Sequence, residues 1–240
     1  MMQGQVLTID SLSAGYSKNK VVDAVSFDVK EGEIFGLVGL NGVGKTTLIK
    51  TILGLREKLG GDIDIAGQDQ LSYLPERFDP PWFLSGYDFI RFSLSLYKKE
   101  ITKDQAKKEV ERVSLNPDFL EHRVNTYSKG MRQKLGLLAT FLTGAPVLIL
   151  DEPMSGLDPK ARQDVKKIIL ETKAEGRSVF MCSHILADVS ELCDRVAVFH
   201  DKSIIFNGSP KELKAKGGDD SLEKAFLSLL TVYDSKGAIS

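Results

Sequence analysis

The sequence is poor in cysteine and carries almost no net charge. Cys182 and Cys193 are the two cysteines of the 240-residue chain. A disulfide-stabilised scaffold would need more cysteines in a shorter chain, and the spacing of these two does not match a zinc motif. The formal net charge of -1 gives no overall attraction to nucleic acid or to an anionic membrane. We therefore expect two reduced, buried thiols and no nucleic-acid partner.

The sequence also lacks a long uninterrupted apolar run. Residues 135–150 include no charged residue, but residues 143–146, Thr-Gly-Ala-Pro, interrupt them. A membrane-spanning helix needs about 20 apolar residues. The stretch therefore predicts a buried helix followed by a buried strand, and a membrane function would require another chain to cross the bilayer. Residues 1–5 show no basic start before an apolar stretch, which predicts no secretory signal.

Short apolar runs alternate with amphipathic stretches along the chain. Hydrophobic residues make up 42% and charged residues 27%, which is typical of a soluble globular domain. The spacing of apolar residues predicts the following buried strands and helices: strands at 34–38, 147–150 and 179–182, and helices at 45–55 and 160–174. Strands that alternate with helices indicate an α/β fold with a parallel sheet.

Further patterns frame this core. Residues 6–9 and 25–29 predict an N-terminal antiparallel β layer, and Ile63 and Ile65 predict an edge hairpin. Residues 196–199 and 204–206 predict a closing hairpin. We expect a single domain over residues 1–240, with a helical subdomain at about 77–145 and a helical tail at about 211–240.

The turn after the predicted strand 34–38 fits the phosphate-loop pattern G-x-x-x-x-G-K-[ST] in full over residues 39–46. Glycines let the backbone N–H groups face phosphates, and the following helix start is positive. Lys45 is predicted to reach the β and γ phosphates, and Thr46 to offer its hydroxyl to Mg²⁺. The alternative is a glycine-rich turn without a ligand. The predicted nucleotide-binding residues here are Gly39, Asn41, Gly42, Val43, Gly44, Lys45, Thr46 and Thr47.

Two acids follow the apolar run 147–150. Ligands bind at the carboxyl edge of such strands, so we predict that Asp151 holds Mg²⁺. Glu152 is predicted to point elsewhere, because strand residues alternate in direction, and to deprotonate the attacking water. His184 follows the strand 179–182 and is predicted to contact the γ-phosphate. The alternatives are an acidic turn and an ordinary polar histidine.

At this point the sequence resembles the ATP-binding-cassette ATPase family. The resemblance depends most on residues 127–133, Tyr-Ser-Lys-Gly-Met-Arg-Gln, which are similar to the family signature Leu-Ser-Gly-Gly-Gln. Ser128 and Gly130 match it, whereas Tyr127, Lys129 and Met131 depart from it. The resemblance implies that Ser128 and Gly130 of one copy close on ATP bound by another. Taken alone, Ser128 could also be a helix N-cap.

The same resemblance assigns further residues. Residues 155–158, Ser-Gly-Leu-Asp, match the loop that communicates across the family dimer, and residues 222–227 resemble a C-terminal helix of exporter-type members. Tyr16 lies where the family places an aromatic ring that stacks on adenine, although a turn tyrosine is the alternative. Glu76 stands where the family has a glutamine and is a third predicted Mg²⁺ ligand.

The aromatic stretch 78–97 lies inside the predicted helical insertion. In family transporters this region receives a short helix of the membrane subunit, and exposed aromatic residues suit such docking. We expect some of Trp82, Phe83 and Tyr87 to be partly exposed, while the others pack within the insertion.

The sequence thus predicts an ATPase that uses ATP and Mg²⁺ and drives transport, with export favoured. Its expected partners are a second copy, in a homodimer, and a multi-spanning permease at the cytoplasmic face of the membrane. The alternative is a soluble ATPase of the same family that acts on nucleic acid or the ribosome. The coiled coils of DNA-maintenance members and the paired cassettes of translation factors are both missing.

Overall fold

The computed structural model describes residues 4–16, 19–66 and 71–237. Residues 1–3, within the stretch that predicts no secretory signal, and residues 238–240, within the predicted tail, lie outside this range. Among the described residues, no helix has the length and apolar character needed to cross a bilayer. The chain forms two compact units, which are residues 1–68 with 180–240, and residues 69–179. We call them the first and the second unit.

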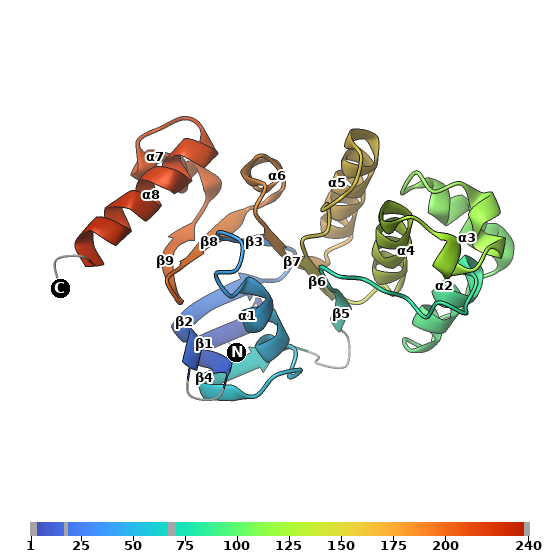
Figure 1. Cartoon of the computed structure of the whole chain (residues 1–240), viewed down its shortest axis with the longest axis horizontal. Coiled ribbons are helices and arrows are strands. Elements are labelled where there is room, and N and C mark those ends of the chain that lie inside the picture. Colours follow the sequence, from blue (N-terminus) through green and yellow to red (C-terminus); the bar gives the residue numbers. More distant parts are fainter. Residues whose placement is uncertain (1–3, 17–18, 67–70, 238–240) are drawn as a thin grey trace. The chain divides into compact units, whose positions relative to one another are not determined.

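The first unit contains an antiparallel sheet and part of a second sheet (Figure 1). In the antiparallel sheet, in the order β2-β1-β4, the strands are β1 (Gln5–Tyr16), β2 (Asn19–Lys30) and β4 (Lys58–Ile65). The other strands, in the order β7-β3-β8-β9, are β3 (Ile34–Val38), β7 (Ser178–Ser183), β8 (Arg195–His200) and β9 (Ser203–Gly208). β3 and β8 are parallel, and β8 and β9 form the predicted closing hairpin. β7 begins two residues before the boundary between the units.

Apolar side chains of both sheets form the core of the first unit. Phe27 of β2 stacks on Phe35 of β3 with 5.4 Å between the ring centroids, and Phe180 of β7 lies within 6.0 Å of both. The helices of this unit are α1 (Lys45–Ile52), α6 (Leu186–Leu192), α7 (Pro210–Gly217) and α8 (Leu222–Gly237). The last two are separated at Gly218, whose left-handed backbone ends α7.

The prediction of an edge hairpin at Ile63 and Ile65 is right about the edge position and wrong about the hairpin. β4 is an edge strand, but it pairs with β1, far away in sequence, as in Leu7 opposite Ile65. The adjacent glycines 60 and 61 occupy an irregular stretch of this ladder, where the register shifts between Asp10 and Ser13. A glycine pair that indicates a turn in the sequence is here a bulge within a strand.

The second unit joins a parallel strand pair to the predicted helices. The strands are β5 (Leu71–Leu74) and β6 (Val147–Asp151), with Leu71 opposite Val147. The helices are α2 (Gly86–Ser95), α3 (Lys103–Glu111), η2 (Pro117–Glu121), η3 (Val124–Thr126), α4 (Lys129–Leu142) and α5 (Pro159–Ala174). Residues 135–150 form most of α4 and the buried β6, as the uncharged stretch predicts.

The α/β fold with a parallel and an antiparallel sheet is therefore confirmed. Both cysteines are buried and free, also as expected, and burial raises the pKa of the Cys193 thiol far above its usual range. The subdomain boundaries at about 77–145 and 211–240 stay a prediction.

Candidate nucleotide-binding site

The glycine loop 39–46 connects the fully buried β3 to α1 in the first unit. Gly42 and Gly44 have φ angles of +79° and +119°, which side chains rarely adopt. A Cβ atom on Gly44 would lie 2.5 Å from Val21 Cγ1, and one on Gly39 would lie 2.5 Å from the Phe199 carbonyl oxygen. At Gly39 and Gly44 the loop backbone therefore lies directly against its neighbours, and these two glycines cannot be replaced without movement.

Lys45 spans this loop with its side chain. Its Nζ atom donates to the Gly39 carbonyl at 2.7 Å and to the Leu40 carbonyl at 3.3 Å, and the residue is buried. Gly44 is the N-cap of α1 without a side-chain hydrogen bond, and the first turn of α1 has no acidic residue. The result is a backbone cradle with a helix start and one ammonium group. This arrangement fits an anionic phosphate chain.

Tyr16 ends β1 with 57% of its surface exposed. The guanidinium carbon of Arg56 lies 3.9 Å from the centroid of its ring, so one face of the ring is covered. Sequence reasoning missed Arg56, because no local pattern links it to Tyr16.

His184 directly follows β7, which ends at Ser183, one residue beyond the predicted strand 179–182, and its side chain is exposed. The Ser183 hydroxyl accepts a hydrogen bond from the Ile185 backbone N–H at 3.1 Å and so shapes the turn around His184. The role of His184 at a γ-phosphate stays a prediction.

The two acids lie in the second unit, after β6. Asp151 is the last strand residue and Glu152 follows it, with 1% and 6% of their surfaces exposed. The prediction that strand alternation sets the direction of the Glu152 side chain is wrong, because Glu152 lies after the last residue of β6. Its backbone is left-handed, with φ of +52°. The turn itself, which costs about 1–2 kcal/mol for a residue other than glycine, directs the carboxylate.

The signature segment begins α4 in the same unit. Ser128 is the N-cap, and its hydroxyl accepts a hydrogen bond from the Met131 N–H at 3.2 Å. The N-cap role is thus real, and it leaves Ser128 exposed at a helix start. The buried Gln133 amide donates to the Pro153 carbonyl at 3.3 Å. A Cβ atom on Gly130 would lie 3.6 Å from the Gly156 carbonyl oxygen. The structure therefore joins the signature to the segment that follows the two acids.

Tyr127 replaces the usual signature leucine, and the structure gives this departure a physical reason. The side chain is 3% exposed, and its hydroxyl donates to the Phe119 carbonyl. Burial raises the pKa of the phenol to about 12. A Cβ atom on Gly86 would lie 2.2 Å from the Tyr127 oxygen. The glycine at the start of α2 makes room for the phenol, which sequence reasoning did not foresee.

Each of the three predicted Mg²⁺ ligands carries a suitable oxygen donor, and their role as metal ligands stays a prediction. Thr46 supplies a hydroxyl, and Asp151 and Glu76 supply carboxylates, the oxygen ligands that Mg²⁺ prefers. Glu76 follows β5 and is exposed. Over residues 4–16, 19–66 and 71–237, no group of three or more His, Cys, Asp or Glu side chains forms a metal site on its own.

Comparison with known proteins agrees with the geometry of the loop. The family model described as ABC transporter matches residues 22–155, more than half of the chain. The ABC transporter ATP-binding protein YdbJ of Bacillus subtilis is 34% identical over 95% of this chain and 75% of its own length. A fluoroquinolones export ATP-binding protein of Mycobacterium tuberculosis is 36% identical over 88% of this chain and 73% of its own length.

A relative from Synechocystis is also described as an ABC transporter ATP-binding protein. It is 36% identical over 87% of this chain and 62% of its own length. A solved structure of an ATP-binding subunit of an ABC transporter superimposes with a TM-score of 0.86 and 30% identity, over 94% of this chain and 99% of that one. The glycine loop, the acidic strand end and these matches lead to one conclusion: the chain belongs to the ABC transporter family, as a subunit that binds and hydrolyses ATP.

Proposed function

We propose that the chain powers export through a separate membrane subunit. The observation that carries this proposal is the 36% identity, over 88% of the chain, to a fluoroquinolones export ATP-binding protein. The exporter-like form of the signature at residues 127–133 agrees with it. The transported compound is a property of the membrane partner.

For the chemistry, the first unit holds the phosphates and the second supplies the acids. Lys45 and the N–H groups at the start of α1 bind the phosphate chain. Glu152 accepts the proton of the attacking water, and His184 stabilises the γ-phosphate. Thr46, Asp151 and Glu76 are the proposed metal ligands. A bound Mg²⁺ would neutralise charge on the phosphate oxygens.

We further propose that two copies of the chain form a homodimer, in which Ser128 and Gly130 of each copy contact ATP held by the other. Ser128 is exposed at the start of α4, so a helix N-terminus is available to phosphate oxygens of a second copy. The Tyr16 ring stacks on the base.

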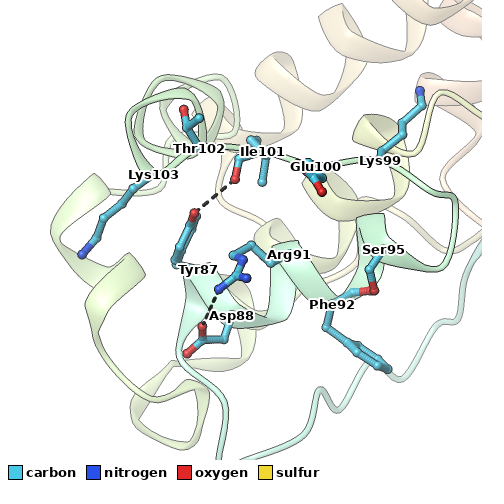
Figure 2. A pocket seen from close by; sticks show the side chains of 10 residues that line it. All are labelled: Tyr87, Asp88, Arg91, Phe92, Ser95, Lys99, Glu100, Ile101, Thr102 and Lys103. Carbon is cyan, nitrogen blue, oxygen red and sulfur yellow. Dashed lines mark hydrogen bonds and ion pairs between the residues drawn. The ribbon is translucent and has the colours of Figure 1, made fainter.

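The docking surface for the membrane subunit lies on the helical insertion, near residues 78–97. Trp82, Phe83 and Phe92 have 65%, 58% and 51% of their surfaces exposed, and apolar exposure of this kind marks interaction sites. Beside α2 is a hollow of about 650 Å³ (Figure 2). The Tyr87 hydroxyl donates to the Ile101 carbonyl at 3.1 Å across it. Phe92 lines the hollow, which could receive a short helix.

With this partner, the chain would be a peripheral protein at the cytoplasmic face of the membrane. A soluble ATPase that acts on nucleic acid or the ribosome is the second candidate. The net charge of -1 does not favour it.

Purification of the tagged chain from its native cells in mild detergent distinguishes these functions. We expect a stoichiometric partner with several membrane-spanning helices. The double substitution Trp82→Ala and Phe83→Ala should reduce its recovery severalfold, whereas Leu227→Ala, a change at a similarly exposed residue of α8, should not. Ribosomes or soluble partners, with the chain absent from membranes, would contradict the transport proposal.

A further inference from the structure

Tyr16 and Arg56 lie side by side because of the β1–β4 ladder in the first unit. The ladder pairs Ala14 with Lys58 in antiparallel register. Arg56 lies in the bend two residues before β4 begins, near this end of the ladder, where its side chain reaches the Tyr16 ring at the end of β1. The neighbourhood therefore follows from the pairing of strands that are far apart in sequence.

Two interactions hold the Arg56 guanidinium. Its carbon lies 3.9 Å from the centroid of the Tyr16 ring, and Nη1 donates to the Gly15 carbonyl at 3.1 Å. A Cβ atom on Gly15 would lie 2.0 Å from the Asn19 carbonyl oxygen, so the backbone that accepts this bond is closely packed. Arg56 Nε is buried and makes no hydrogen bond with the described residues. A partly desolvated cation is attracted more strongly to an aromatic face.

An aromatic ring has two faces, and Arg56 covers one of them. The ring is nevertheless 57% exposed, so its other face is accessible. We propose that Arg56 is a positioning residue for the nucleotide base: it fixes the Tyr16 ring, and the base stacks on the opposite face, in the order Arg56, Tyr16, base. This inference rests on the proposed function, in which Tyr16 stacks on the base of ATP.

The expected effect is a change in affinity. Without Arg56, the exposed Tyr16 side chain is free to change rotamer, and ordering it on binding lowers affinity by about two- to tenfold. The phosphate contacts do not involve Arg56. Its removal should therefore weaken binding of ATP and leave binding of inorganic tripolyphosphate unchanged.

The test is a double-mutant cycle on the full chain, with equilibrium titrations of ATP and of tripolyphosphate. Arg56→Ala should weaken ATP binding two- to tenfold in the wild-type background and have no further effect in the Tyr16→Ala background. Arg56→Gln, which keeps a donor for the Gly15 carbonyl but no charge, should weaken ATP binding as Arg56→Ala does. Lys58→Ala, an exposed neighbour in β4, is the matched control and should change neither affinity.

The outcomes separate this inference from the proposed function. If Tyr16→Ala leaves ATP affinity unchanged, the stacking role of Tyr16 is wrong, and the inference with it. If Tyr16→Ala weakens ATP binding but Arg56→Ala does not, only the inference is wrong. An equal loss for ATP and tripolyphosphate, or an equal loss in both backgrounds, would also contradict it. So would tighter ATP binding by Arg56→Ala, because the guanidinium would then occupy the face that the base needs.

Discussion

β3 in the first unit and β6 in the second are matched strands that end differently. Each has five residues, all buried, and each is followed by a turn with left-handed backbone. After β3 the left-handed positions are Gly42 and Gly44, whereas after β6 the position is Glu152. Glycine adopts this backbone without strain, and glutamate does not. The proposed phosphate-binding loop, which would bind through its backbone, has glycine at these positions. The proposed base requires a side chain, and its turn is strained.

The turn after β3 is proposed to bind phosphate, and the turn after β6 is proposed to supply the base for hydrolysis. The largest expected effect is on the rate of ATP hydrolysis. Glu152→Gln removes the proposed general base and keeps the shape of the side chain. Steady-state ATP hydrolysis should fall by about 10²–10⁴-fold, the usual contribution of such a group. ATP affinity should stay the same, because the phosphate cradle is untouched. Glu223→Gln, at an exposed position in α8, is the control and should hydrolyse ATP normally.

A second substitution disturbs the binding side. Gly44→Ala would require an unfavourable φ of +119° and a Cβ atom 2.5 Å from Val21 Cγ1, so the loop must move. We expect ATP affinity, measured by equilibrium titration, to fall at least about tenfold. Gly176→Ala tests the backbone cost alone, since its φ is +80° and no atom lies within 4 Å of the added Cβ. This control should lower stability without changing ATP affinity; a similar loss of affinity in both variants would contradict a local effect at the cradle.

The smallest effect concerns the strain at Glu152. Glu152→Gly and Glu152→Ala both remove the buried carboxylate, but only glycine accepts φ of +52° without strain. The glycine variant should be more stable than the alanine variant by about 1 kcal/mol. This difference is the energetic cost of a left-handed backbone for alanine, reduced by the larger conformational entropy that glycine loses on folding. Chemical denaturation of the two variants measures the difference. Greater stability of the alanine variant would show that the turn is not strained.

The elements that position the site were predictable because they are apolar and local. The buried run 34–38 and the glycines after it specify β3 and the loop, and residues 147–150 specify β6, without knowledge of the rest of the chain. The N-cap role of Ser128 could be foreseen as well, because capping depends on a few adjacent residues.

Three features could not be predicted, and each depends on distant or rare geometry. The left-handed backbone of Glu152 contradicts the ordinary preference of glutamate. The position of Arg56 on Tyr16 depends on the β1–β4 register, which an irregularity near Gly61 shifts. The room that Gly86 makes for the Tyr127 phenol joins residues on separate helical segments. Sequence patterns describe neighbours along the chain, whereas these contacts arise from tertiary pairing.

The proposal that the glycine loop binds phosphates and that Glu152 supplies the base is tested most directly by two numbers measured side by side. ATP affinity and ATP turnover should be determined for Gly44→Ala and for Glu152→Gln in the same preparation conditions. Our account predicts that Gly44→Ala loses affinity at least about tenfold, and that Glu152→Gln keeps affinity but loses turnover by at least about 10²-fold. Near-normal hydrolysis by Glu152→Gln would contradict the account.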